Sequence, residues 1–143
     1  MKIESELQAE LLKVIDAPGW MTFKHSDGLT SGVPDISRTA YGFTSWWELK
    51  RLAPEHVYPM KLSGTELQRI NMRQLSLSSV QAAWYVVWTQ EHTLIVHPSE
   101  VSIRGNVILM RDPEKKRVFG PEDHEAVKLF MIDLHTQVLP RRQ

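Results

Sequence analysis

The stretch Gly32–Arg51, GVPDISRTAYGFTSWWELKR, contains the features that decide both the fold and the chemistry of this chain. Two segments of β-type composition flank a turn near Gly42, and this pattern predicts an antiparallel hairpin. Side chains alternate along a strand, so Glu48 and Lys50 should share one face. The return of the hairpin should bring Asp35, at the start of the first strand, beside Glu48.

Asp35 and Glu48 are candidate metal ligands, because two converging carboxylates form a hard-oxygen site that suits Mg²⁺ or Mn²⁺. The backbone carbonyl of Leu49 could supply a further ligand. Lys50 stands two residues from a ligand, where it can orient the attacking water in the hydrolysis of a phosphodiester. The alternative is an exposed edge strand, on which Glu48 and Lys50 would form a solvated ion pair of little energetic value.

The composition fits one globular domain over residues 1–143. The 17 basic and 17 acidic residues balance, so any contact with DNA must come from a local patch. The chain has no cysteine, which excludes disulfides, thiolate nucleophiles and thiolate-bound zinc. The N-terminal segment holds no apolar signal core, and no run reaches the ~20 apolar residues of a membrane span. We therefore expect an intracellular protein without a membrane partner.

Hydrophobic periodicity predicts an α/β fold with helices on both faces of a central sheet. The segment 80–89 is apolar almost throughout, which favours a strand that is covered on both faces. The segment 53–64 holds two prolines and is expected to be a long loop. Helices are expected at 3–16, from 63 or 65 to 75 and at about 121–137, and strands at 20–24, 35–42, 44–52, 80–89, 93–97 and 106–111, with a turn at 112–116.

The first predicted helix carries an acid on its apolar side. At about 100° per residue counted from Ile3, the apolar residues cover about 0–120°, and Glu4 falls at about 100°. Glu6 falls at about 300°, outside this sector. A carboxylate that faces the core needs a partner, and a metal site would provide one. Alternatively, Glu4 is a first-turn acid that the helix dipole favours.

Several other residues are candidates for function or for the core. His124 and His135, eleven residues apart on the last helix, are expected on its solvated surface. Trp84 and Trp88 lie in the apolar run and are expected in the core, whereas Trp46 shares the face of the acids and could contact DNA. Basic side chains that flank the motif or cluster elsewhere are candidates for phosphate contact: Lys24, Arg38, Arg51, Lys61, the turn 111–117 and the tail 141–142.

Four blocks of the sequence resemble the PD-(D/E)xK nucleases, and within them the virus-type replication-repair nuclease (VRR-NUC) group. The blocks are ESELQ (4–8), SGVPDI (31–36), WWELKR (46–51) and LSGTELQR (62–69), and they stand in the order of that family. The resemblance implies a core of helix, mixed β-sheet and helix within residues 1–98, and it leaves residues 99–143 unmatched. It also implies hydrolysis of DNA phosphodiesters with Mg²⁺ or Mn²⁺, leaving 5′-phosphate ends.

The resemblance also implies roles for individual residues. Asp35 and Glu48 would be metal ligands, Lys50 the catalytic lysine, Glu4 an acid that holds metal through water, and Gln68 a brace from the following helix. Stand-alone members resemble Holliday-junction resolvases and act as homodimers on branched DNA in repair and recombination. We therefore expect a structure-selective DNA endonuclease in the cytosol of a bacterium or of a phage-infected host. A catalytically silent DNA-binding module and a sequence-specific restriction-type nuclease are the alternatives.

Overall fold

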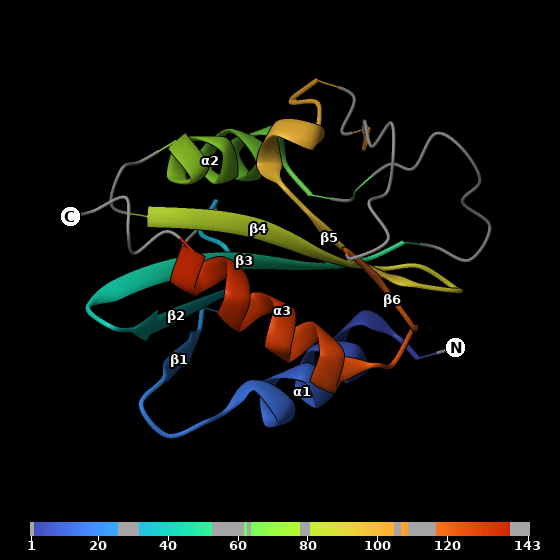
Figure 1. Ribbon diagram of the computed structural model, residues 1–143. Coiled ribbons are helices and arrows are strands. Elements are labelled where there is room, and N and C mark those ends of the chain that lie inside the picture. The colour runs from blue at the N-terminus through green and yellow to red at the C-terminus, as the bar shows by residue number, and fades with distance from the viewer. Residues whose placement is uncertain are drawn as a thin grey trace.

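A mixed six-stranded sheet with helices on both faces forms the protein (Figure 1). The computed structural model describes residues 2–25, 32–52, 62, 64–77, 81–104, 107–108 and 117–137. The strands follow one another across the sheet in chain order: β1 (Met21–Lys24), β2 (Ile36–Ala40), β3 (Phe43–Arg51), β4 (Gln81–Trp88), β5 (Thr93–Val96) and β6 (Val118–Phe119). The helices are α1 (Glu4–Ile15), α2 (Glu66–Leu77), the 3₁₀ turn η1 (Pro98–Glu100) and α3 (His124–Gln137). The expected α/β class is confirmed.

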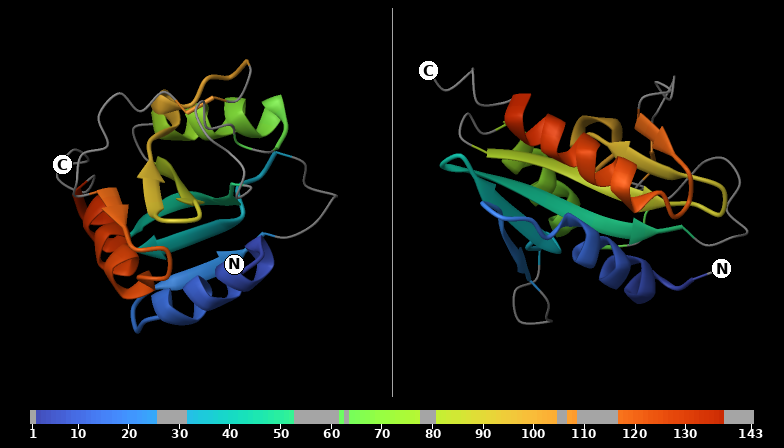
Figure 2. Two further views of the ribbon diagram at one scale, coloured as in Figure 1. Left: turned by 90° about the vertical axis from the view of Figure 1, so that its right-hand side faces the viewer. Right: turned by 60° about the horizontal axis from the view of Figure 1, so that its bottom comes forward.

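The connection from β3 to β4 determines how the layers are stacked. These two strands are parallel, and every other neighbouring pair is antiparallel. A parallel pair needs a crossover, and α2 provides it on one face of the sheet. Helices α1 and α3 pack together on the opposite face, as Figures 1 and 2 show. The expected placement of helices on both faces is therefore confirmed.

The β2–β3 hairpin turns through Tyr41 and Gly42, whose φ angles are 57° and 72°. Two successive residues with positive φ define a type I′ turn, whose twist matches that of the flanking strands. The turn fixes the register so that Ile36 lies opposite Trp47. One step further along, Asp35 and Glu48 stand opposite each other, as the sequence predicts.

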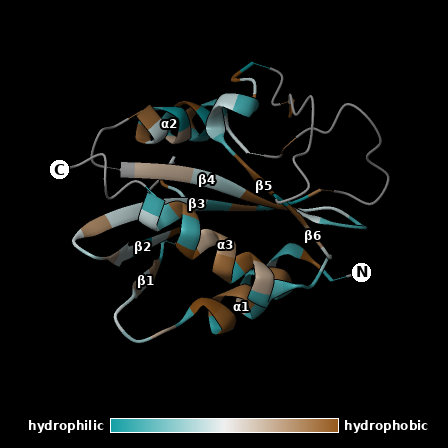
Figure 3. Cartoon of the chain, in the orientation of Figure 1, coloured by the Kyte–Doolittle hydropathy of each residue, from teal (hydrophilic) through white to brown (hydrophobic). Residues whose placement is uncertain are grey.

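The sheet separates two apolar clusters. Trp47 and Leu49 of β3 pack toward α1 and α3, whereas Trp46 contacts the cluster that includes Met72 of α2. Strand β4 is buried over its described side chains, and Figure 3 shows the apolar character of β4 and β5. Trp84 and Trp88 lie in the core as expected. None of the helices in the described residues is long and apolar enough to cross a membrane.

The C-terminal third differs from the prediction in two places. Of the expected strand at 106–111, the described residues show only an isolated bridge between Val101 and Ile108, and the unpredicted β6 follows later in the chain. The last helix begins at His124 instead of about 121, because the Asp123 carboxylate accepts a hydrogen bond from the Ala126 N–H at 3.4 Å and caps it. The expected turn at 112–116 lies outside the described residues.

The prediction that His124 and His135 are solvated is wrong, because both are buried against the sheet or α1. His135 Nε2 bonds to the Ala40 carbonyl at 3.1 Å, and its Nδ1 lies 2.7 Å from Ser45 Oγ. Burial lowers the pKa of His135, which keeps its ring neutral. His124 Nε2 lies 3.1 Å from a carboxylate oxygen of Glu10 on α1.

Candidate active site

The carboxyl group of Glu48 is buried on the face of β3 that looks toward α2. Glu48 is 1% exposed, and apart from the neighbouring Asp35 carboxyl its oxygens have no hydrogen-bond partner among the described residues. Burial, followed by the neighbouring carboxylate of Asp35, raises the pKa of Glu48 to about 9, while Lys50 acts in the opposite direction. An unpartnered buried carboxylate is costly unless it is protonated or meets a cation. This is the strongest electrostatic anomaly of the site.

Along the edge of β3 that faces β2, side chains make the hydrogen bonds that a neighbouring strand would otherwise make. The ladder between β2 and β3 ends at the Ile36–Trp47 pair, so the backbone beyond it would lack partners on this edge. Asp35 Oδ2 accepts a hydrogen bond from the Leu49 N–H at 2.8 Å, and Gln8 Nε2 donates one to the Leu49 carbonyl at 3.2 Å. These contacts satisfy the buried backbone and fix the end of β3.

Glu4 completes the same edge from α1. Its Oε1 accepts a hydrogen bond from the Arg51 N–H at 2.8 Å, whereas Glu6 is exposed. Glu4 and Gln8 are four residues apart and so lie on one face of the helix, one turn above the other. The expectation that Glu4 and not Glu6 faces the sheet is therefore met. Among the described residues, however, no group of three or more His, Asp and Glu side chains is arranged to hold a metal ion.

Lys50 and Gln68 meet around Gly64, at the start of α2. A Cβ added to Gly64 would lie 2.4 Å from Gln68 Oε1 and 3.5 Å from Lys50 Nζ, so the amide and the ammonium are neighbours. Thr65 caps the helix: its Oγ1 accepts from the Gln68 N–H and its own N–H donates to Gln68 Oε1, both at 3.1 Å. This cap holds the Gln68 side chain beside Lys50.

The donor atoms at this place suit a divalent cation. Apart from the Asp35 carboxyl beside it, the two oxygens of Glu48 have no hydrogen-bond partner among the described residues. The Leu49 carbonyl has two lone pairs, so one can accept from Gln8 and the other would be available to a cation. These are hard oxygen donors of net negative charge, the ligand type that Mg²⁺ and Mn²⁺ prefer.

The candidate DNA contacts are distributed unevenly. Lys24 is exposed on β1, while Arg51 and Trp46 are half-buried on β3. Arg38 is 1% exposed: it donates to the Ile15 carbonyl at 2.7 Å and stacks on Trp20, which is at odds with a contact to DNA. We therefore leave Arg38 out of the functional proposal. Lys61, residues 111–116 and the tail 141–142 lie outside the described residues.

Two residues near the acids have no role in the sequence-based prediction. Gln8 holds the backbone carbonyl of the candidate ligand Leu49. Tyr85 lies opposite Glu48 on β4, and burial, with a contribution from the Glu48 carboxylate, raises its pKa well above the usual range. Tyr85 therefore stays a neutral phenol and forms part of the floor beneath the acid pair.

Comparisons of the structure with solved structures find distant likenesses. No protein family model matches this sequence, and no curated protein matches it. The structure is similar to that of Hjc, a Holliday junction resolvase from the archaeal hyperthermophile Archaeoglobus fulgidus, with a TM-score of 0.47 and 13% identity over 73% of this chain and 82% of that chain. At this distance the likeness carries neither a family nor an activity over to this chain.

Proposed function

We propose that this protein is a divalent-metal-dependent DNA endonuclease of the PD-(D/E)xK type, resembling the VRR-NUC group. Its substrate is structured DNA, such as a Holliday junction or another branched form, and its products carry 5′-phosphate ends. The observation that carries the proposal is the Glu48 carboxyl group, buried beside the Asp35 carboxyl and near Lys50, with no other hydrogen-bond partner among the described residues. Two acids and a backbone carbonyl can hold a cation that polarises a phosphodiester, and a lysine beside them can orient the attacking water.

Each residue of the site has a distinct task in this proposal. Asp35, Glu48 and the Leu49 carbonyl would hold Mg²⁺ or Mn²⁺. A cation bound there would neutralise charge on the scissile phosphate and on its leaving oxygen. Lys50 donates to the attacking water and stabilises the charge that develops during attack, and Gln68 keeps the ammonium in place. Glu4 fixes the end of β3 through the Arg51 N–H and would accept a hydrogen bond from a water bound to the cation.

Glu4→Gln should reduce cleavage more than Glu6→Gln. Glutamine keeps the size of Glu4 and one acceptor for the Arg51 N–H, but it removes the negative charge next to the cation shell. We expect a loss of about 10-fold, typical of groups that support metal ligands, against no measurable loss for exposed Glu6. Initial cleavage rates at saturating Mg²⁺ measure both. A larger loss for the Glu6 variant would show that the wrong acid of α1 has been chosen.

Gln8→Met should weaken cation binding without unfolding the protein. Methionine matches the length of glutamine but cannot donate to the Leu49 carbonyl, so this ligand loses its fixed orientation. We expect the affinity for Mn²⁺, measured by calorimetry without DNA, to fall about 10-fold. Gln74→Met, on the exposed side of α2, is the matched control and should bind as the parent does. Equal affinity in both variants would remove Gln8 from the site.

The DNA partner and the assembly form part of the same proposal. Trp46 lies next to the acid pair on the same face of β3, Arg51 ends that strand, and exposed Lys24 lies two strands away in the sheet. These side chains, with Lys61, are the proposed DNA contacts. Symmetric cutting of a four-way junction requires two active sites related by a two-fold axis, so we propose a homodimer. The proposed place of action is the cytosol of a bacterium or of a phage-infected host.

A substrate panel separates this function from its alternatives. Four-way junction, flap, single-stranded and linear duplex DNA are each incubated with Mg²⁺ or Mn²⁺. A structure-selective endonuclease cuts the junction or the flap and spares the linear duplex. Cutting of linear duplex at fixed sequences would instead indicate a restriction-type nuclease. Binding without any cutting would indicate a silent DNA-binding module.

A further inference from the structure

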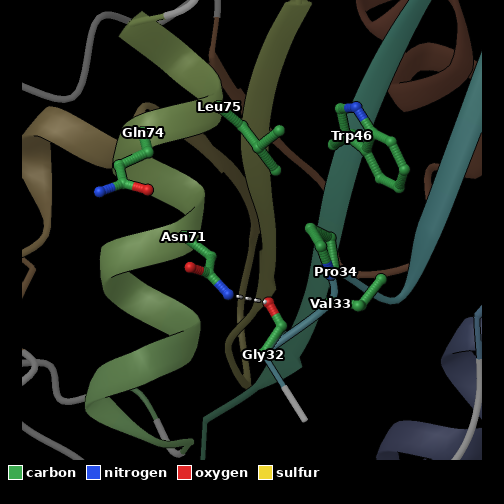
Figure 4. A pocket seen from close by; sticks show the side chains of 7 residues that line it. All are labelled: Gly32, Val33, Pro34, Trp46, Asn71, Gln74 and Leu75. Carbon is green, nitrogen blue, oxygen red and sulfur yellow. Dashed lines mark hydrogen bonds between the residues drawn. The ribbon is translucent and has the colours of Figure 1, made fainter. Parts of the chain in front are cut away.

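A hollow of about 330 Å³ lies between α2 and the segment that leads into β2. Val33, Pro34 and Trp46 line one wall, and Leu75 of α2 lines the other (Figure 4). Gly32, Asn71 and Gln74 complete its rim. The inner surface is therefore mostly apolar, and one aromatic ring contributes to it.

One end of the hollow is closed by a close contact between the two walls. The Asn71 amide donates to the Gly32 carbonyl at 3.0 Å, as Figure 4 shows. Gly32 has a φ of 92°, and a Cβ there would lie only 2.6 Å from Asn71 Nδ2 and 3.0 Å from Leu67 Cγ. A glycine is required for this approach. The backbone of Gly32 and the side chain of Asn71 therefore close one end of the hollow.

The hollow adjoins the acid pair along both strands of the hairpin. Pro34 directly precedes Asp35, and Trp46 is two residues from Glu48 on the same face of β3, a separation of about 7 Å. His25 packs against Trp46, with ring centroids 5.4 Å apart and planes 32° apart, and its Nε2 lies 2.8 Å from Ser37 Oγ. The Trp46 ring is therefore held in position next to the proposed metal site.

We propose that this hollow receives an unpaired nucleobase of the nucleotide next to the scissile phosphate. A base is separated from its phosphate by one sugar, which matches an apolar hollow beside the acid pair. Apolar and aromatic walls favour the face of any base.

The hollow accepts a base without reading its identity. Figure 4 shows the Asn71 amide directed at Gly32 and the Gln74 amide directed away from the hollow. Base identity is read through hydrogen bonds to base edges, and these amides are not placed to make them. Selection therefore acts on whether the nucleotide is unpaired. This inference rests on the proposed nuclease function, and it explains a preference for DNA structure over DNA sequence.

The test uses junctions that differ in one nucleotide, after the cleavage position has been mapped. The nucleotides on either side of the scissile phosphate are replaced in turn by an abasic residue, and affinity is measured with Ca²⁺ in place of Mg²⁺. We expect wild-type protein to bind one abasic junction about 10-fold more weakly, and to bind all four bases at that position alike. This comparison needs no variant of the protein.

Two variants assign the effect to the hollow. Trp46→Ala should bind the intact and the abasic junction equally, whereas Tyr41→Ala, exposed in the β2–β3 turn, should keep the 10-fold difference. Normal cleavage with no abasic effect in wild-type protein would overturn the base pocket and leave the nuclease function standing. A strong dependence on base identity would overturn the claim that the base is not read. Absence of cleavage on every DNA would refute the nuclease function itself.

Discussion

Lys50→Ala is expected to lower DNA cleavage by about 10²–10⁴-fold while cation and DNA binding stay nearly unchanged. The Lys50 ammonium lies beside Gln68 at the start of α2, close enough to lower the pKa of Glu48 by its charge. It is not a proposed ligand, so its removal should affect the attacking water and leave the cation in place. Single-turnover cleavage of a four-way junction measures the rate of the chemical step. An electrophoretic mobility-shift assay measures DNA binding.

Lys24→Ala provides the matched control for the loss of a positive charge. Lys24 is exposed on β1 and has no proposed role in the reaction. Its removal should weaken DNA binding slightly and leave the single-turnover rate at saturation intact. A Lys50 variant that cleaves as fast as wild type would remove Lys50 from the mechanism, and equal rate losses in both variants would point to binding as the cause.

Glu48→Gln should stabilise the metal-free protein at alkaline pH and abolish its stabilisation by Mg²⁺ or Mn²⁺. Burial raises the pKa of Glu48 to about 9 in the folded chain, well above its unfolded value. Between these two values the folded state binds more protons, so wild-type stability is full at low pH and falls as pH rises through about 9. Glutamine mimics the neutral acid. The difference in free energy of unfolding between the variant and the wild type should therefore grow with pH to several kcal/mol, at roughly 1.4 kcal/mol per pKa unit.

Denaturant unfolding in EDTA at pH 5, 7 and 9 measures this difference directly. Subtracting the profiles isolates Glu48 and the charged groups it interacts with, because the more distant titrating groups, including buried His135, are common to both proteins. Repeating the series with Mg²⁺ should restore wild-type stability at high pH and leave the Gln variant unchanged. Parallel profiles in EDTA would mean that Glu48 is not desolvated in the way the fold indicates.

The position of the acid pair was predictable because it depends only on strand alternation and on a two-residue turn. Strand alternation places Glu48 and Lys50 on one face, and the Tyr41–Gly42 turn sets the register that brings Asp35 opposite Glu48. The helical wheel likewise turns Glu4 toward the sheet. The same wheel puts Gln8 near Glu4, but it does not reveal that β2 ends early and leaves the Leu49 carbonyl in need of a donor. That requirement comes from the pairing of distant strands.

Buried polar residues account for the main errors. The sequence places His135 on a solvated helix surface, yet its two ring nitrogens bond to Ser45 and Ala40 across about ninety residues of chain. Arg38 alternates with Ile36 and so belongs to the core-facing side of β2, which was a usable signal in the sequence. Its partner, the carbonyl at the end of α1, depends on tertiary packing and was not predictable.

The most direct measurement compares cleavage of a four-way junction by wild-type protein and by Asp35→Asn, in Mg²⁺ and in EDTA. Asparagine keeps an oxygen for the Leu49 N–H, so β3 should remain in place while the site loses one negative charge. We expect paired incisions leaving 5′-phosphate ends by wild-type protein in Mg²⁺, none in EDTA, and a loss of at least about 100-fold in the variant. Incision that persists in EDTA, or that is as fast in Asp35→Asn as in wild type, would contradict a metal site at Asp35 and Glu48.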